Sequence, residues 1–250
     1  MSEVQLLERL KPRVDKTIKS LRKTKFRVDP IGGAAYSRAT SIVSAAYKRH
    51  GQILEEAIRT RLSDCEYFSV WHEPDFQIPS MADHAIAARN AELDDSLPIE
   101  LPYDQPGQSR SIQIDALVFD KRIGSLRSYE IKRGNGYFDS GKKRSILRDV
   151  LATQALLKSY GAKHSMIASI VESRVIAYYG IKPLPAPYSL AGDELDDHFV
   201  FPVTKYVEEV NDYFRTLLYQ LLQEVGSPAQ MDMFEDLCER CPMRNGAVAN

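Results

Sequence analysis

Two acidic side chains and a lysine lie close together between residues 111 and 134, in the segment SIQIDALVFDKRIGSLRSYEIKRG. Two strand-like apolar runs flank a short basic turn; the first contains Asp115, and the second ends in Glu130, Ile131 and Lys132. Side chains alternate along a strand, so Glu130 and Lys132 share one face, and a hairpin brings Asp115 beside them. Two carboxylates and a lysine at one point can hold a hard divalent cation and position a water molecule.

The alternative for these three side chains is a structural ion pair across two buried strands. Such a pair is a poor stabiliser, because removing charges from water costs about as much as their attraction returns. Buried strands rarely accept charged side chains that are neither paired nor used. We therefore favour the metal-binding interpretation.

Hydrophobic periodicity predicts the elements that position these residues. We expect Pro12 to kink or divide the first helix, Gly51 to be a possible interruption of the second, and Gly161 to end the third. We read 73–110 as a long excursion with a short helix over 82–91, and 134–143 and 182–198 as loops. The predicted helices are 3–23, 37–63, 145–160 and 203–225, and the predicted strands outside the hairpin are 67–71, 165–171 and 174–179.

This order of elements favours an α/β fold with a mixed central β-sheet flanked by helices. We expect three parts along the chain. Residues 1–35 form a basic N-terminal helical arm, 36–225 form the core that includes the excursion, and 226–250 form a C-terminal tail.

The hairpin resembles the active-site signature of the PD-(D/E)XK nuclease superfamily, which has the restriction-endonuclease-like fold. Ile114 and Asp115 stand where that family often has Pro-Asp, and Glu130-Ile131-Lys132 matches its (D/E)-X-K element. Fourteen residues separate Asp115 from Glu130, a gap that suits a hairpin of the family's central sheet. The resemblance covers roughly residues 41–180 and is closest in layout to type II restriction endonucleases.

The resemblance implies a Mg²⁺-dependent endonuclease that hydrolyses phosphodiester bonds in double-stranded DNA, with Mn²⁺ as a possible substitute. Asp115 and Glu130 would be the metal ligands, together with the backbone carbonyl of Ile131. Lys132 would orient or deprotonate the attacking water, or neutralise charge on the phosphate. Type II restriction enzymes commonly act as homodimers, so we also expect a homodimer.

Family members often carry a further acid on an upstream helix, and here that position points to Glu55, with Glu56 as the alternative. Either would complete the metal shell or anchor the catalytic lysine. Adjacent acids with Arg59 one turn later are equally typical of an exposed ion-pair face. Both interpretations stay open.

Gln154 lies on the predicted helix that follows the hairpin, and it either reaches the site or packs within the helix face. The exonuclease-like branch of the superfamily has a Gln-x-x-x-Tyr motif on such a helix. Here Lys158 stands at the fourth place after Gln154, and Tyr160 is out of register. This departure argues against the exonuclease branch.

Charge is distributed unevenly although the net charge is only −1. Residues 1–50 hold 12 Lys/Arg and 4 Asp/Glu, and residues 121–148 hold nine Lys/Arg against two acids. Clustered positive charge indicates polyanion binding, although a solvated loop or helix face is the alternative. The basic arm and the excursion are candidates for duplex contact and recognition. The predicted phosphate-binding residues are Arg133, Lys142, Lys143 and Arg144.

Three cysteines argue against a disulfide framework and favour a reducing cytoplasm. Cys238 and Cys241 form a CxxC, but a structural zinc site needs four ligands and no second pair is present, so we do not expect zinc. No apolar run reaches the roughly 20 residues of a membrane span, and the N-terminus lacks the apolar core of a signal peptide.

Two other functions remain compatible with the sequence. One is a repair, recombination or mobile-element nuclease with structure-specific cleavage. The other is a non-catalytic DNA-binding module that kept the fold, which the presence of both acids and the lysine argues against.

Overall fold

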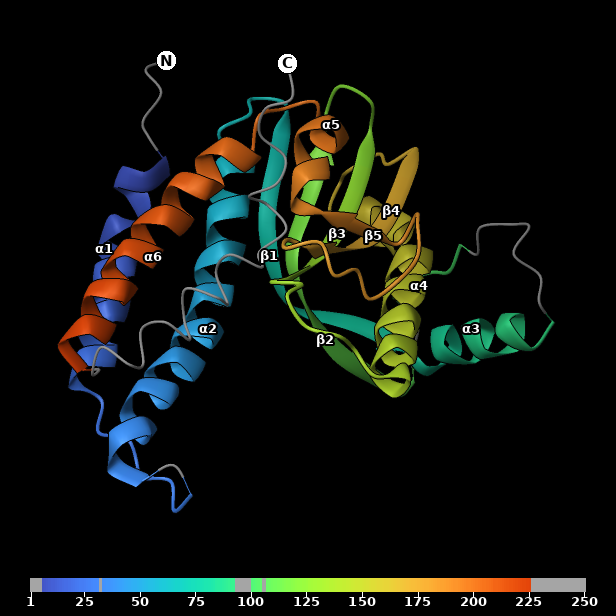
Figure 1. The fold of residues 1–250 in the computed structure, drawn as a ribbon. Coiled ribbons are helices and arrows are strands. Elements are labelled where there is room, and N and C mark those ends of the chain that lie inside the picture. The colour runs from blue at the N-terminus through green and yellow to red at the C-terminus, as the bar shows by residue number, and fades with distance from the viewer. Residues whose placement is uncertain (1–5, 32, 93–99, 105–106, 226–250) are drawn as a thin grey trace, which may run out of the picture. The chain divides into compact units, whose positions relative to one another are not determined.

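The computed structural model describes residues 6–31, 33–92, 100–104 and 107–225. The chain forms two compact units (Figure 1). One unit comprises residues 62–201 and contains the β-sheet, whereas the other is helical and joins residues up to 61 with residues from 202 onward. The expected arm of residues 1–35 and the two long helices that flank the sheet unit in sequence thus belong to the same unit.

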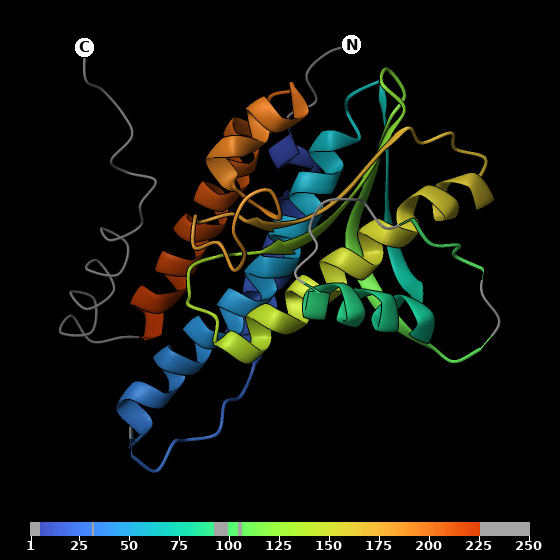
Figure 2. The same cartoon turned by 90° about the vertical axis from the view of Figure 1, so that its right-hand side faces the viewer.

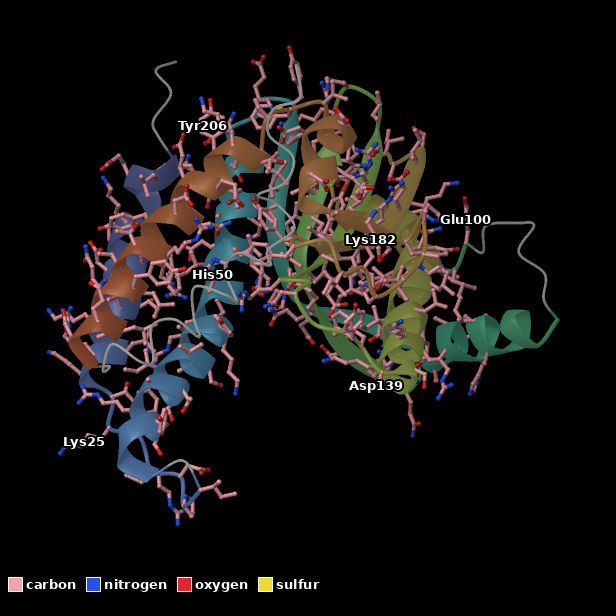
Figure 3. All side chains as sticks on the ribbon, viewed as in Figure 1. Lys25, His50, Glu100, Asp139, Lys182 and Tyr206 are labelled. Atoms are coloured by element: carbon pink, nitrogen blue, oxygen red, sulfur yellow. The ribbon has the colours of Figure 1, made fainter. Side chains whose placement is uncertain are left out.

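The helical unit contains α1 (Leu6–Lys23), α2 (Gly33–Leu62) and α6 (Thr204–Val225). Buried side chains recur every three or four residues along α1, which is the spacing of one helix face. His50 on α2 (Figure 3) lies 3.0 Å through Nε2 from Oδ1 of Asn211 on α6, and both side chains are buried. Arg49 on α2 donates to the carbonyl of Thr17 on α1 at 3.5 Å.

These three helices confirm the predicted spans to within a few residues. Pro12 does not divide α1, because the buried Leu10 and Val14 on either side of it keep the helix packed. Gly51 lies inside α2 without interrupting it. Within the described residues, no helix is both long and apolar enough to cross a lipid bilayer.

The other unit is built on a five-stranded mixed sheet in the order β1-β2-β3-β4-β5. The chain is therefore an α/β protein with a mixed central sheet flanked by helices, as the sequence predicts. The β1-β2 and β2-β3 pairs are antiparallel, and the β3-β4 and β4-β5 pairs are parallel. The strands are β1 (Phe68–Pro79), β2 (Ser109–Asp120), β3 (Ser125–Lys132), β4 (Ile170–Ala177) and β5 (Ser189–Ala191).

Helices cover both faces of this sheet. The long helix α4 (Ser140–Lys163) connects the parallel strands β3 and β4 and packs on the face that includes Leu126. On the opposite face, Phe199 of α5 (Leu195–Phe199) contacts Tyr129 with ring centroids 5.3 Å apart. Successive residues of β3 therefore face α4 and α5 in turn.

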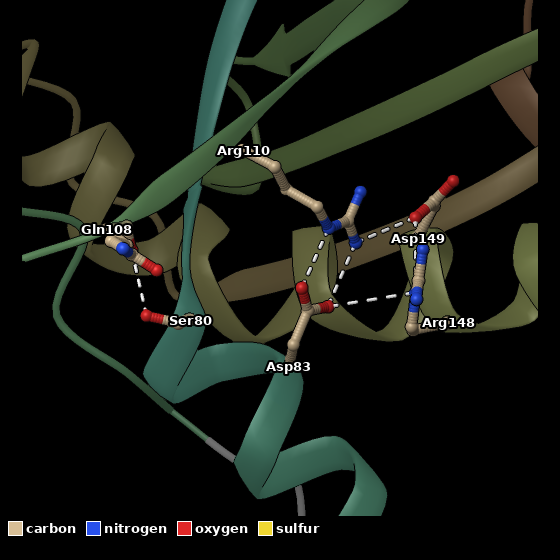
Figure 4. Close-up of polar contacts among 6 residues, drawn as sticks. All are labelled: Ser80, Asp83, Gln108, Arg110, Arg148 and Asp149. Atoms are coloured by element: carbon tan, nitrogen blue, oxygen red, sulfur yellow. Dashed lines mark hydrogen bonds and ion pairs between the residues drawn. The ribbon is translucent and has the colours of Figure 1, made fainter.

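The helix α3 (Ser80–Glu92) is fixed beside α4 by a network of alternating charges (Figures 2 and 4). Arg110 on β2 donates two hydrogen bonds to Asp83 at 2.8 and 3.0 Å and forms an ion pair with Asp149 at 2.8 Å. Arg148 adds longer contacts of 3.8 Å to both acids. The network has no net charge, because the carboxylates of Asp83 and Asp149 balance the guanidinium groups of Arg110 and Arg148.

The predicted excursion over 73–110 is shorter than expected, although its helix over 82–91 is confirmed. Strand β1 continues to Pro79 because Phe76 and Ile78 are fully buried, and β2 already begins at Ser109. The described part beyond α3 is also attached to α4: Leu101 N–H donates to the Ala155 carbonyl at 2.8 Å. Glu100 (Figure 3) forms an ion pair there with Lys158 at 2.8 Å.

Three further expectations about the elements are wrong. The predicted strands 165–171 and 174–179 are one strand, β4, because Glu172 and Arg174 pair with each other at 3.1 Å instead of marking a turn. Gly161 lies inside α4, where a Cβ would meet Leu126 at 3.1 Å, so it serves close helix–sheet packing and does not end the helix. The predicted loop 182–198 contains β5, the 3₁₀ helix η1 (Gly192–Glu194) and most of α5.

Candidate active site

The predicted hairpin exists, and a hydrogen bond at its open end connects Asp115 to the segment that holds Glu130 and Lys132. Strands β2 and β3 pair from Asp120 opposite Ser125 to Ala116 opposite Tyr129. The ladder ends there, and β2 is irregular between Ile114 and Leu117, where its pairing with β1 shifts register. Glu130 and Lys132 share the face of β3 that carries α4. Asp115 reaches β3 through its side chain, which contacts the backbone of Ile131.

Asp115 is buried, with 6% of its surface exposed, and both of its carboxylate oxygens accept hydrogen bonds. Oδ2 accepts from the backbone N–H of Ile131 at 2.7 Å, and Oδ1 accepts from Nε2 of Gln113 at 3.2 Å. These two bonds fix the orientation of the carboxylate, because each of its oxygens accepts from a different donor.

The bond from Ile131 also defines the direction of the Ile131 carbonyl. The N–H and C=O groups of one strand residue point to the same side of the strand. Since the N–H of Ile131 points to Asp115 on β2, its carbonyl points to that side as well. The next carbonyl, of Lys132, points the other way and accepts from Tyr178 N–H at 2.9 Å. The backbone thus directs a carbonyl oxygen toward the Asp115 side, where the resemblance predicts a metal ligand.

Glu130 and Lys132 form an ion pair on the same face of β3. Lys132 Nζ lies 2.8 Å from Glu130 Oε1, and the two side chains are 37% and 33% exposed. The pair is thus accessible to solvent, in contrast to the buried Asp115. An ion pair of this exposure contributes roughly 0–1 kcal/mol to stability, so stability alone gives little reason to have it here.

The donor atoms at this point fit a hard divalent cation. The carboxylates of Asp115 and Glu130 and the carbonyl of Ile131 are all oxygen donors, which Mg²⁺ and Mn²⁺ prefer. The described residues contain no cluster of three or more His, Cys, Asp or Glu side chains suited to a metal ion. Mg²⁺ commonly keeps several water ligands, so two carboxylates and one carbonyl are a sufficient set of protein donors for it.

The basic residues predicted to bind phosphate follow β3 and begin α4. Asp139 (Figure 3) caps the helix by accepting from Lys142 N–H at 2.8 Å, and this bond lowers the pKa of its carboxyl group. Lys142, Lys143 and Arg144 are exposed in the first turns, and none forms an ion pair with another described residue. Arg133 differs, because its guanidinium lies 5.5 Å from the centre of the Tyr179 ring.

A glycine holds the connection between β3 and this basic segment in place. Gly134 has φ +70°, and a Cβ on it would lie 2.7 Å from the Ala177 backbone. No other residue fits that approach without backbone movement. The segment leaving Lys132 is therefore tied to the end of β4.

The remaining predicted site residues have other contacts. Gln154 accepts through Oε1 from the N–H of Ser173 at 3.3 Å; Ser173 pairs with Ser128, roughly 13 Å along β3 from Lys132. Glu56 forms an exposed ion pair with Arg13 at 3.5 Å inside the helical unit. Glu55 lies on α2 in the same unit, and its metal role stays a prediction.

Gln113, which donates to Asp115, was not predicted as part of the site; its position two residues before Asp115 on the same strand face was the available signal. Cys238 and Cys241 lie outside the described residues.

A scan of protein-family models, a search of curated proteins and a search of solved structures each give no match to this chain. The geometry of the hairpin is therefore the basis for a functional assignment.

Proposed function

We propose that this protein is a Mg²⁺-dependent endonuclease that hydrolyses phosphodiester bonds in double-stranded DNA, as type II restriction enzymes do. The observation that carries the proposal is the bond from Ile131 N–H to the Asp115 carboxylate. It links β2 to β3 at Ile131, the residue between Glu130 and Lys132, which form an ion pair.

Phosphodiester hydrolysis requires charge stabilisation on the phosphate, an activated water and stabilisation of the leaving oxygen. Mg²⁺, when bound, supplies Lewis-acid polarisation of the phosphate and lowers the pKa of a bound water. Asp115 and Glu130 would hold it, with Ile131 contributing a carbonyl oxygen. Asp115 is already oriented by two hydrogen bonds, so little reorganisation is needed when a substrate binds.

Lys132 is the residue that distinguishes this set from a simple cation site. Its ammonium group is on the same face of β3 as Glu130, directly after the residue whose N–H binds Asp115, and its side chain is accessible to a substrate. There it would orient the attacking water or offset the negative charge that grows on the phosphate. The exposed Lys142, Lys143 and Arg144 would hold neighbouring phosphates and position the backbone without reading sequence.

Incubation with supercoiled plasmid tests the proposal. The full-length protein should linearise or fragment the plasmid with Mg²⁺ or Mn²⁺ and should be inactive in EDTA. Discrete fragments with one end sequence would indicate restriction-type specificity, and selective cutting of branched or single-stranded substrates would indicate a repair-type nuclease. Sedimentation of the protein on duplex DNA would report whether it acts as a homodimer.

Two results would contradict the proposal. One is failure to cut plasmid, linear duplex, branched DNA or RNA with either metal, combined with tight duplex binding, which would favour the non-catalytic binder. The other is metal-dependent cleavage that Asp115→Asn and Lys132→Ala leave unchanged, which would place the active site elsewhere.

A further inference from the structure

A second candidate site lies at the other end of the same hairpin, beside the β2–β3 turn. A hollow of about 270 Å³ opens there between the hairpin and the end of α5. Arg127 is the residue of β3 that lines the hollow, and it is five positions from Lys132, which is roughly 17 Å along the strand. The residues that line it are Asp120, Arg122, Ile123, Arg127, His198, Phe199 and Val200.

Guanidinium groups outnumber carboxylates around this hollow. Arg122 donates to both oxygens of Asp120, at 3.0 and 2.7 Å. Arg127 and Arg174 share one carboxylate, Glu172, at 3.3 and 3.1 Å. The lining itself has two guanidinium groups, those of Arg122 and Arg127, and one carboxylate, that of Asp120.

The pairing of Arg127 is also incomplete. Its Nε is buried and lies 3.3 Å from Glu172 Oε2, without the alignment of a hydrogen bond. Buried donors without a hydrogen bond are rare in folded proteins and commonly mark a place that a ligand or an ion completes. The Arg127 side chain is 14% exposed, so it is reachable from the hollow.

His198 contributes no positive charge to the site. Its Nε2 lies 2.6 Å from the hydroxyl oxygen of Tyr129, and burial together with the nearby Arg174 and Arg127 lowers its pKa to about 3. Burial also raises the pKa of Tyr129, so this hydroxyl stays protonated and donates to the imidazole. The excess positive charge is therefore located on the guanidinium groups.

Apolar side chains form the rim opposite these charges. Ile123 in the turn is 48% exposed, and Val200 is 79% exposed. Val200 also adopts φ +50°, ψ +43°, a left-handed conformation that is unfavourable for a β-branched residue. This conformation ends α5, where the Val200 N–H donates to the Asp197 carbonyl at 3.3 Å and so holds the residue at the rim.

We propose that this hollow binds a small organic ligand carrying a phosphate or carboxylate group. The oxyanion bonds to Arg127 and Arg122, and the organic part lies against Ile123, Phe199 and Val200. Planar guanidinium groups match both oxyanions in shape and charge. A volume near 270 Å³ accommodates one ring or a short chain beside the anion, but not a duplex. The proposal is independent of the cleavage chemistry at Asp115.

Calorimetric titration of the full-length protein with inorganic phosphate, phenyl phosphate and benzoate tests this site. Binding of phenyl phosphate alone assigns a phosphate ester, binding of benzoate alone assigns a carboxylate, and binding of both assigns the shared oxyanion chemistry. If inorganic phosphate binds as tightly as phenyl phosphate, the proposed contact between the ligand and the apolar rim is wrong. No heat with any probe at millimolar concentration would overturn the proposal.

An exposed turn residue gives variants that should fold normally. Ile123→Glu places a carboxylate at the rim and should weaken probe binding by about tenfold or more, because like charges repel across a short distance. Ile123→Gln also removes the apolar contact but adds no charge, so it should weaken binding less than Ile123→Glu, and the difference between the two variants measures the effect of the charge. Met81→Glu adds the same charge to α3, outside the hollow, and should leave binding unchanged. Equal weakening by Ile123→Glu and Met81→Glu would contradict the assignment.

Discussion

The carboxylate of Asp115 accepts a hydrogen bond from the backbone N–H of Ile131 at 2.7 Å. This bond replaces a strand-to-strand backbone bond just beyond the last ladder pair, Ala116 with Tyr129. The Asp115 side chain therefore joins the two strands at the open end of the hairpin, beside Glu130 and Lys132. The same contact orients a metal-binding carboxylate and directs the Ile131 carbonyl toward it.

Asp115→Asn is expected to abolish cleavage and preserve the fold. The amide oxygen still accepts from Ile131, but the negative charge that would hold Mg²⁺ is lost. We expect plasmid cleavage to fall by at least about 100-fold, the order found when one electrostatic contact to a transition state is removed. Asp104→Asn, which removes an exposed carboxylate paired with Lys163, is the control and should cut normally.

Binding and melting measurements complete that experiment. Duplex affinity measured in Ca²⁺ and the melting temperature of Asp115→Asn should be close to the wild-type values. A variant that melts much earlier and cuts proportionally less would indicate that Asp115 has only a structural role.

Lys132→Ala separates chemistry from stability. Lys132–Glu130 and Lys158–Glu100 are both ion pairs of 2.8 Å, and both lysines are substantially exposed. Loss of either pair should cost at most about 1 kcal/mol in the free energy of unfolding, because exposed pairs contribute little. Only Lys132→Ala should abolish cleavage, and Lys158→Ala is its matched control. Single-turnover cleavage and thermal unfolding measure the two effects; equal activity of both variants would refute the role of Lys132.

Replacing Lys142, Lys143 and Arg144 together by Gln should weaken duplex binding without affecting the metal site. Each phosphate contact releases bound counterions, so three lost contacts should reduce the slope of log affinity against log salt concentration by about 2–3. Fluorescence anisotropy at several salt concentrations gives this slope. An unchanged slope would show that these three side chains stay in solvent in the DNA complex and do not contact phosphates.

Much of this fold follows from periodicity in the sequence. The buried faces of α1 and α6 repeat with the helical period, and β2 and β3 coincide with apolar runs that are buried on both faces, so these elements were predicted closely. The single strand β4 was not predicted. In the sequence, the polar residues Glu172 and Ser173 resemble a turn, and only the structure shows that Arg174 and Arg127 form ion pairs with Glu172. Such pairing joins separate strands and has no local signal.

For the candidate site, the sequence predicts which charged residues come together but not all the contacts that hold them. Alternation predicts the shared face of Glu130 and Lys132, and the length of the hairpin predicts that Asp115 lies near them. The hydrogen bond from Gln113 and the direction of the Ile131 carbonyl depend on where the ladder ends, and the sequence does not show that point. The contact from Gln154 to Ser173 required the packing of α4 on β4.

The network around Arg110 gives a prediction about stability. Arg110→Met keeps the apolar stem but leaves Asp83 and Asp149 close together without their strongest partner. We expect a loss of about 1–3 kcal/mol in the free energy of unfolding, the usual cost of leaving partly buried charges unpaired. Arg148→Met removes only 3.8 Å contacts of a half-exposed side chain and should cost much less. Urea unfolding of both variants measures the difference, and similar losses would show that Arg110 is not the main link.

His198 should make the protein less stable as the pH falls below neutrality. Its folded-state pKa of about 3 is below the ordinary value of 6.5, because the imidazole is buried beside Arg174 and Arg127. The unfolded chain therefore binds a proton that the folded chain does not. The stability from neutral His198 is fully present above pH 6.5 and is lost progressively as the pH falls toward 3.

The pH dependence of unfolding for His198→Gln isolates this contribution. Glutamine can accept from Tyr129 as the imidazole does but does not titrate. Between about pH 6 and 4.5, the wild-type free energy of unfolding should fall with a slope approaching 1.4 kcal/mol per pH unit relative to the variant. The carboxylates whose pKa values are lowered, such as Asp83 and Asp120, are common to both proteins and cancel in the difference. Parallel pH profiles would mean that His198 becomes protonated in the folded state at ordinary pH, and that the hollow beside it carries a second positive charge.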